Sequence, residues 1–310
     1  MHKGEDNMAN QVSALNDIFG IEDVLHFRDA GSGFIIADIK NHLANASIAL
    51  QGAHLMTWAP EDAQPVIWMS PVAKFASGKS IRGGVPICWP WFGPHATESS
   101  FPGHGFARTV PWEIISTESA GDGSTHIAFR IFDSEAGSAQ WPQPTEAEMR
   151  MRIGKSLELE LITRNTGTSV ITIGDALHTY FAVGDVRKTT VLGLDGCDYL
   201  DKVDGGKRKR QDGAVTIDSE VDRIYFDQGQ DCVIDDDAMG RRIRIEKRCS
   251  HSTIVWNPWV EKCVKMGDFG SDDGYLGMIC VESANAADDV VTIAPGESHA
   301  LWVRYSVENC

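Results

Sequence analysis

The sequence lacks the features of secreted and membrane proteins. Its seven cysteines are odd in number and scattered, and no two form a CxxC pair, so we expect reduced thiols rather than a disulfide framework. The first twenty residues carry acids and amides where a signal peptide needs a basic start and an apolar run. No stretch approaches the roughly twenty apolar residues of a membrane span. These absences predict a cytoplasmic protein without membrane contact.

Positive charge is also scarce, since the formal net charge is −16 at pH 7. Nucleic-acid binding depends on a dense basic surface, so this charge argues against nucleic acid as a partner. A chain this acidic must concentrate its few cations locally if it handles an anionic substrate. The hydrophobic content of 42% and charged content of 23% are those of an ordinary globular protein.

Several catalytic motifs are missing. The sequence has no GxSxG nucleophile elbow and no GxxxxGK[ST] phosphate loop. It also lacks HxH, HExxH and any Cys/His ligand spacing, so we expect neither a metal nor another cofactor. An acid and a base without a nucleophile remain, which favours proton-transfer chemistry.

The sequence has a two-residue hydrophobic period along most of its length and no long helical period. Residues Ser156–Arg164 are the clearest case, with leucines on one face and glutamates on the other. One short helix is expected within Gln11–Asp29, in an extension covering about residues 1–30. We therefore predict an all-β fold, a large antiparallel β-sandwich with a few short helices, in a single domain over 1–310. Further strands are expected at Phe34–Lys40, Ala46–Leu50, His54–Trp58, Pro65–Met69, Trp112–Ser116, Thr125–Phe132, Val170–Ile173, Asp175–Val183, Val215–Ile217, Arg242–Glu246, Thr253–Trp256, Gly277–Glu282, Val290–Ile293 and His299–Val307.

Two stretches stand apart from this pattern. Lys79–Arg108 combines paired glycines, prolines, aromatics and arginines, which suits a fixed loop whose side chains point one way. Lys202–Gly213 is the most polar stretch of the chain. Its basic cluster Lys207–Arg210 could bind an anion, but a solvated hairpin tip is the preferred interpretation.

Four residues are candidates for chemistry because each lies at a strand end or in a glycine-lined turn: His104, His178, Asp222 and Glu282. His178 precedes Tyr180 and Phe181, so burial is expected, either as a core histidine or as a functional one. Glu282 follows an apolar run, where a carboxylate is desolvated for proton transfer or paired structurally.

The chain resembles the hexose-6-phosphate mutarotases (glucose-6-phosphate 1-epimerases) of the aldose 1-epimerase superfamily. That family folds as a large antiparallel β-supersandwich, as expected here from the strand pattern. The similarity is carried by SIRGGVPICWPWFGPH at 80–95, HGFAR at 104–108, ALHTYF at 176–181, DRIY at 222–225, WNP at 256–258 and CVES at 280–283.

The resemblance implies a role for each matching residue. Glu282 removes the proton from the anomeric hydroxyl and His178 protonates the ring oxygen, without a cofactor. His104 and Asp222 bind sugar hydroxyls. The substrate phosphate is held by Arg82 and Arg108.

Other implications concern departures from the family, partners and alternatives. Gly103 stands where some relatives carry glutamine, and Ser283 where threonine is common.

The expected partner is a small-molecule sugar phosphate, and the expected state is a monomer or weak homo-oligomer. Three alternatives stay open: an aldose 1-epimerase for free sugars, a non-catalytic carbohydrate-binding protein on the same fold, and a metal-dependent sugar isomerase.

Overall fold

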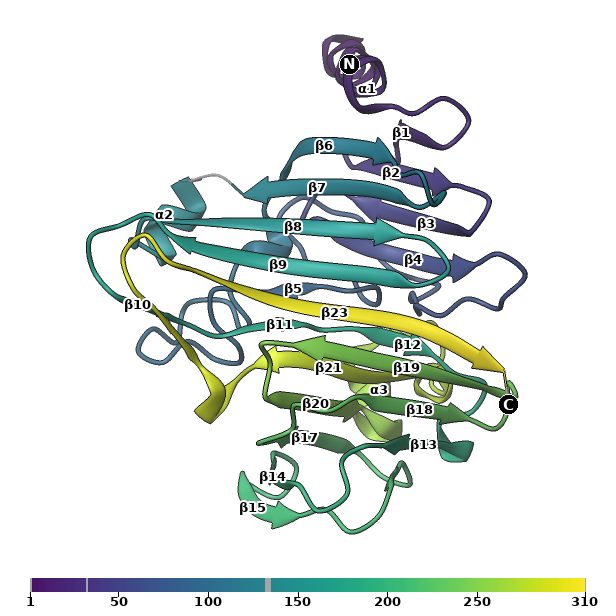
Figure 1. The fold of residues 1–310 in the computed structure, drawn as a ribbon, viewed down its shortest axis with the longest axis vertical. Coiled ribbons are helices and arrows are strands. Elements are labelled where there is room, and N and C mark those ends of the chain that lie inside the picture. The colour runs from purple at the N-terminus through teal and green to yellow at the C-terminus, as the bar shows by residue number, and fades with distance from the viewer. Residues whose placement is uncertain (1, 32, 132–134, 310) are drawn as a thin grey trace.

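The computed structural model describes residues 2–31, 33–131 and 135–309, and strands dominate it. Every pairing between named strands in these ranges is antiparallel. Figure 1 shows two large sheets, with a smaller four-stranded sheet beside the upper part of the first. The prediction of an all-β, antiparallel sandwich is therefore confirmed.

The largest sheet has nine strands. Its central strands alternate buried and more exposed side chains, with the odd-numbered residues pointing into the core. In β9 (Leu157–Asn165), for example, Leu157, Leu159 and Leu161 are fully buried. In spatial order its strands are β16 (Val215–Thr216), β13 (Thr189–Leu192), β18 (Cys232–Asp236), β19 (Arg241–Arg248), β23 (Ser298–Asn309), β9 (Leu157–Asn165), β8 (Thr145–Ile153), β7 (Thr125–Ile131) and β6 (Glu113–Ser119).

The second sheet has eight strands and positions the pocket described below. Its central strand β21 is buried along its whole length, as expected for a strand covered on both faces. The order is β15 (Lys207–Arg210), β14 (Asp198–Asp201), β17 (Val221–Tyr225), β20 (Ser252–Asn257), β21 (Met278–Asn285), β11 (Asp175–Leu177) and β5 (Ile87–Cys88), with β12 (Tyr180–Ala182) also paired to β21.

The remaining elements are smaller. None of the helices in the described ranges is long and apolar enough to cross a membrane. The four-stranded sheet holds β1 (Leu25–Asp29), β2 (Ile35–Lys40), β3 (Ala44–Ala49) and β4 (His54–Pro60), and β10 (Ile171–Ile173) pairs with β22 (Val291–Ile293). The helices are α1 (His2–Phe19), α2 (Glu135–Gln140) and α3 (Trp259–Met266), with 3₁₀ turns η1 (Ala107–Thr109), η2 (Val186–Lys188), η3 (Gly274–Gly277) and η4 (Ala287–Asp289).

One continuous apolar cluster joins the sheets. Fully burying a side chain such as leucine stabilises a fold by about 1.5–3 kcal/mol, so this cluster supplies the main driving force. The pairs β3–β8 and β21–β23 are in contact, so the nine-stranded sheet packs on both the four-stranded and the eight-stranded sheet. The single-domain organisation over 1–310 stays a prediction.

Three strand or helix boundaries were predicted wrongly. The N-terminal helix spans His2–Phe19 and so begins before the predicted range Gln11–Asp29, whose last residues, Leu25–Asp29, form strand β1. Pro65–Met69 forms only isolated bridges, from Ile67 to Phe181 and from Met69 to Gly83. The strand expected over Asp175–Val183 is interrupted between β11 and β12, at His178 and Thr179. Phe132, the last residue of one predicted strand, lies outside the described ranges.

The basic cluster is also placed differently than expected. Lys207–Arg210 is the edge strand β15 itself, and the hairpin tip is 202–206. Its cations are solvated but paired with carboxylates: Lys207 with Asp204, Arg208 with Asp288, Lys209 with Asp201 and Asp204, and Arg210 with Asp198.

Candidate active site

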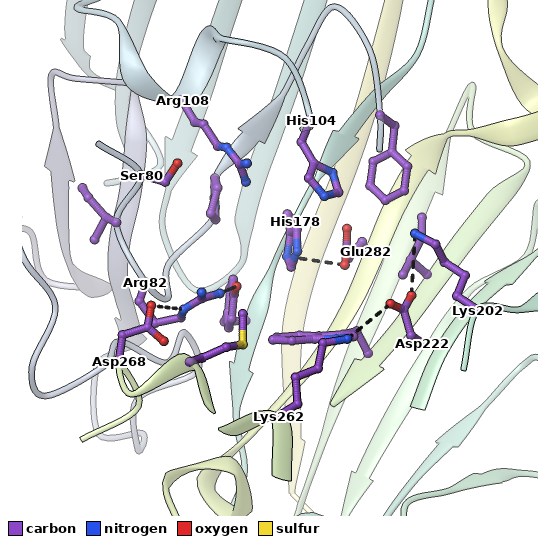
Figure 2. Close-up of a pocket in the computed structure, with 17 residues that line it drawn as sticks. Ser80, Arg82, His104, Arg108, His178, Lys202, Asp222, Lys262, Asp268 and Glu282 are labelled. Atoms are coloured by element: carbon purple, nitrogen blue, oxygen red, sulfur yellow. Dashed lines mark hydrogen bonds and ion pairs between the residues drawn. The ribbon is translucent and has the colours of Figure 1, made fainter. Parts of the chain in front are cut away.

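A pocket of about 360 Å³ opens on the face of the eight-stranded sheet. Figure 2 shows three groups in it: arginines at one side, lysines at the other, and histidines with a glutamate between them. All six residues singled out from the sequence line this one pocket, although up to 200 positions separate them: Arg82, His104, Arg108, His178, Asp222 and Glu282.

His178 and Glu282 form a buried pair at the centre. The Nδ1 atom of His178 lies 3.4 Å from the Oε1 atom of Glu282. Glu282 is on β21, and His178 lies in the break between β11 and β12, the two short strands that pair with β21. The break turns the imidazole onto the sheet face, where it stacks on Tyr180 at 5.0 Å between ring centroids.

Burial shifts both members of this pair toward their neutral forms. It raises the pKa of Glu282 well above its ordinary value, and the nearby Asp222 carboxylate adds to the rise. It lowers the pKa of His178 well below its ordinary value, and His104 and Arg108 add to that fall. Burial therefore disfavours the charged form of each group.

Three polar atoms around the pair have no hydrogen-bond partner among the described residues: His178 Nδ1, Glu282 Oε2 and Arg108 Nε. Leaving a buried polar group unpaired costs about 1–3 kcal/mol. Such unpaired groups facing a pocket are typical of sites that bind polar ligands.

His104 is held as a neutral hydrogen-bond donor. The Gly93 N–H donates to its Nδ1 at 3.3 Å, so the proton of the neutral ring is on Nε2. Burial lowers the pKa of His104 to about 3, and Arg108 and Lys202 contribute. A Cβ at Gly105 would lie 1.9 Å from the Trp89 carbonyl oxygen, so only glycine fits there.

The arginine end of the pocket comprises Arg82, Arg108 and Asp268. Arg82 donates from Nε to Asp268 Oδ2 at 3.0 Å and from Nη1 to the Tyr180 hydroxyl at 2.7 Å. Arg108 donates from Nη2 to the Gly103 carbonyl at 2.8 Å. Two guanidinium groups face one carboxylate, so this end carries one excess positive charge.

The paired glycines beside Arg82 allow a close backbone approach. A Cβ would lie 2.7 Å from Met69 Cα at Gly83 and 2.2 Å from His54 Nε2 at Gly84. Gly103 is different, because its nearest neighbour to an added Cβ is the Gly93 oxygen at 3.7 Å. A side chain therefore fits at position 103.

The opposite side, the lysine end, comprises Lys202, Lys262, Asp222 and Glu220. Asp222 on β17 lies between the two ammonium groups, with Oδ1 4.0 Å from Lys202 Nζ and Oδ2 3.9 Å from Lys262 Nζ. Lys262 also donates to Glu220 at 2.7 Å. Two cations thus face two carboxylates. Burial raises the pKa of Asp222, and the two lysines oppose that rise.

Sequence reasoning missed both lysines and Asp268. Lys202 lies in the polar stretch interpreted as a solvated hairpin, and in fact begins its tip. Lys262 is on α3, a helix of eight residues, which is too short to show a clear helical period in the sequence. The only sequence signal for such a residue was a polar side chain next to a strand that ends in an acidic residue, as Lys202 follows Asp201.

The aromatic residues of the Lys79–Arg108 stretch divide between core and pocket. Trp89 is buried and donates to Thr163 at 2.9 Å, and Trp91 donates to the Pro102 carbonyl at 3.1 Å. Phe92 lines the pocket, as does Trp256, which the sequence did not single out. Trp89 and Trp91 therefore serve in packing, and Phe92 is the one of these three that faces the pocket.

One group of metal-ligand types lies together in the described ranges. Ligand atoms of His178, Cys280 and Glu282 are within 4.8 Å of one another. Sequence spacing could not reveal this cluster, because His178 lies about a hundred positions before the other two. Burial raises the pKa of the Cys280 thiol well above its ordinary value, which opposes its use as a thiolate ligand.

Comparisons with known proteins agree with this geometry. A family model described as "Aldose 1-epimerase" matches residues 36–306. A protein of Escherichia coli (strain K12) named "Putative glucose-6-phosphate 1-epimerase" is 38% identical over 283 residues, 91% of this chain and 93% of that protein. A protein of the same name from Cenchrus ciliaris is 34% identical, over 81% of this chain and 78% of that protein.

Solved structures extend the comparison. The crystal structure of a "putative mutarotase" from Salmonella typhimurium superposes with a TM-score of 0.88 at 34% identity, covering 98% of this chain and all of that one. A galactose mutarotase related enzyme from Lactobacillus acidophilus has a TM-score of 0.69 at 14% identity, covering 88% and 97% of the two chains. The second likeness bears on the fold alone.

Proposed function

The chain belongs to the aldose 1-epimerase family, and from this premise we propose that it interconverts the α and β anomers of a hexose 6-phosphate, with glucose 6-phosphate the first candidate. The observation that carries the proposal is the buried contact of His178 with Glu282, 3.4 Å apart within a pocket that has excess positive charge at one end.

The reaction needs one proton removed from O1 and one delivered to O5. Glu282 as carboxylate accepts the proton from O1, while His178 as imidazolium donates a proton to O5, and the C1–O5 bond breaks. The open-chain aldehyde rotates about C1–C2, and the ring closes on the other face of C1 with the two roles reversed. The substrate gains one proton and loses one, so the two side chains together hold the same number of protons before and after each step.

The pKa shifts favour this direction of transfer. Ring opening leaves Glu282 protonated and His178 neutral, which are the forms that burial prefers. Burial thus makes Glu282 a stronger base and His178 a stronger acid than in water. His104, with its proton on Nε2, supplies a neutral donor to a sugar oxygen nearby.

The arginine end supports a phosphate rather than a hydroxymethyl group as its occupant. The whole chain repels a phosphate dianion at long range, so the attraction must be local. Arg108 has an unpartnered Nε, and its guanidinium shape suits two phosphate oxygens at once. Arg82 is oriented by Asp268 and Tyr180, which fixes its plane.

The test is NMR anomer exchange on glucose 6-phosphate, run beside free glucose and galactose. We expect exchange of the phosphate well above the uncatalysed rate and slow exchange of the free sugars. Equal acceleration of all three sugars would instead indicate an aldose 1-epimerase for free sugars. Binding without exchange would indicate a carbohydrate-binding protein.

A further inference from the structure

The lysine end of the pocket has no part in the proton transfer above. Four of its groups lie close together, and the charges of Lys202 and Lys262 are balanced by Asp222 and Glu220. A neutral end suits a neutral, hydroxylated part of a substrate. An inference about that part deepens the proposed function and rests on it.

The connectivity of a pyranose tells which part reaches the lysine end. In a hexose 6-phosphate the phosphate is attached through C6 to C5, and O5 and C1 follow around the ring. If O5 and O1 lie at His178 and Glu282 and the phosphate lies at Arg82 and Arg108, the ring carbon opposite C5 points the other way. That carbon is C2. Figure 2 places Asp222 and Lys202 opposite the arginines, and Lys262 below the His178–Glu282 pair with its ammonium group toward Asp222.

The spacing at the lysine end leaves room for a hydroxyl oxygen. The separations of 4.0 and 3.9 Å between Asp222 and the ammonium groups are too long for direct hydrogen bonds. A hydroxyl oxygen about 2.8 Å from both a lysine nitrogen and a carboxylate oxygen bridges such a gap, accepting from one and donating to the other. Within the described ranges the Asp222 carboxylate accepts no hydrogen bond.

The two lysines are held in place by contacts of their own with the protein. The Lys202 backbone N–H donates to the Asp222 carbonyl at 2.9 Å, and its ammonium lies 5.9 Å from the Phe92 ring centroid. Lys262 donates to Glu220 at 2.7 Å. Each therefore presents a fixed ammonium group beside Asp222, which also favours the ionised form of that carboxylate.

We propose that Lys202 and Lys262 are specificity-determining residues, which flank Asp222 as donor–acceptor–donor and recognise the hydroxyl on C2 of the hexose phosphate. A hydroxyl both accepts from an ammonium and donates to the carboxylate. A sugar without that hydroxyl leaves these charged groups unpaired, and sites of this kind reject such analogues strongly. A 2-amino sugar adds a positive charge between two lysines and is disfavoured for that reason.

The experiment is a double-mutant cycle between the protein and its substrate. Lys202→Met and Lys262→Met are assayed on glucose 6-phosphate and on 2-deoxyglucose 6-phosphate, with anomer exchange and calorimetric Kd as readouts. Wild type should prefer glucose 6-phosphate by roughly 10–1000-fold, and each Met variant should lose most of that preference. The loss should fall on glucose 6-phosphate, with the deoxy sugar little changed.

Matched controls keep charge loss separate from contact loss. Lys265→Met removes an exposed lysine from the same helix as Lys262, and Lys207→Met removes one from strand β15 beside the hairpin tip that carries Lys202. Both should behave as wild type on both sugars. Lys202→Arg keeps a donor and should keep a measurable preference, which also shows that a loss in the Met variant is not misfolding.

Outcomes separate this inference from the proposed function. Equal losses on the two sugars in the Met variants, or no loss in folded variants, overturn the assignment of the lysines while leaving the mutarotase intact. If wild type binds glucose 6-phosphate without exchange, the proposed function fails and the Kd cycle still decides the lysines. If it neither binds nor exchanges the sugar, both fail.

Discussion

The hairpin β14–β15 and the pocket both gather cations, yet they use them differently. In the hairpin, Lys207–Arg210 is the densest run of positive charge in the sequence, and each of its residues has a carboxylate partner. In the pocket, Arg82 and Arg108 lie 26 positions apart; Arg82 pairs with the carboxylate of Asp268, whereas Arg108 donates to the Gly103 carbonyl. Local charge density along the chain therefore does not predict where excess charge accumulates.

The difference comes from burial as well as from pairing. The hairpin pairs are mostly exposed, apart from the buried Asp201 partner of Lys209, and an exposed salt bridge contributes little. The pocket groups are partly or fully removed from water, so an unpaired charge or hydrogen-bond donor there has a larger effect. We expect substitutions to separate the two regions, and the following tests run from the largest expected effect to the smallest.

The pair at the pocket centre should give the largest effect. Glu282→Gln and His178→Asn should each reduce anomer exchange of glucose 6-phosphate by roughly 10²–10⁴-fold, because each removes one of the two proton-transfer groups. Exchange measured by NMR checks this, with His126→Asn on β7, remote from the pocket, as the control. Near-wild-type exchange in a folded variant removes that residue from the mechanism.

Substitution of the pocket arginines should give the next largest effect. It directly tests the difference between the cations of the pocket and those of the hairpin. Arg82→Ala and Arg108→Ala should each lower kcat/KM for glucose 6-phosphate by about 2–4 kcal/mol, roughly 30–1000-fold, with little change for free glucose. Arg210→Ala in the hairpin is the matched control and should leave kcat/KM unchanged. Equal losses on the phosphate and the free sugar would sink the phosphate assignment.

Asp175 contrasts with the hairpin carboxylates, because it is buried and has no lysine or arginine partner among the described residues. Asp175 on β11 is fully buried, neither of its oxygens has a hydrogen-bond partner among described residues, and His299 Nε2 is 4.0 Å away. Burial raises the pKa of Asp175 to about 8, and Asp289 adds to the rise. The folded protein therefore holds the protonated acid at neutral pH.

The sign of the resulting pH dependence follows from that shift. A folded-state pKa near 8, above the ordinary 3.8, contributes stability that is complete below pH 4 and is lost as pH rises toward 8. Asp175→Asn removes this loss, so its advantage over wild type in free energy of unfolding should grow from pH 5 to pH 8. We expect a Tm gain of roughly 2–6 °C at pH 8, measured by thermal melts. A constant difference across that range contradicts the buried acid.

The hairpin cations should matter least for stability. Lys207→Ala and Arg210→Ala remove exposed ion pairs, with Asp204 and Asp198 respectively. Their Tm values should stay within about 2 °C of wild type, because exposed pairs contribute little and are screened by salt. A larger decrease in Tm, measured in the same melts, would mean that these ion pairs do stabilise the hairpin.

Chelation should have no effect. The cluster of His178, Cys280 and Glu282 includes the proposed proton-transfer pair, and the arginine end of the pocket beside it carries excess positive charge, which repels a divalent metal. Enzyme treated with EDTA should therefore keep its exchange rate, and metal analysis should find no stoichiometric zinc. Activity lost on chelation and restored by one divalent ion contradicts a mechanism of proton transfer alone.

Much of the fold was determined by the sequence alone. The alternation of Leu157, Leu159 and Leu161 with glutamates predicts β9, because side chains of a strand point to opposite faces in turn. The same signal exists in β8, where Ala147, Met149 and Met151 are buried, although that strand was not predicted. Strand β5 has only two residues, too few to show a period, and was not predicted.

The site residues likewise divide into those that the sequence marked and those that only the tertiary structure brought in. Arg82, His104, Arg108, His178, Asp222 and Glu282 could be singled out from the sequence because local motifs and strand ends mark them. That they converge on one pocket, and that Lys202, Lys262 and Asp268 join them, was decided by the tertiary structure. Strand pairing across the eight-stranded sheet brings a turn, a helix and a loop to one face, and no local pattern encodes which distant groups meet there.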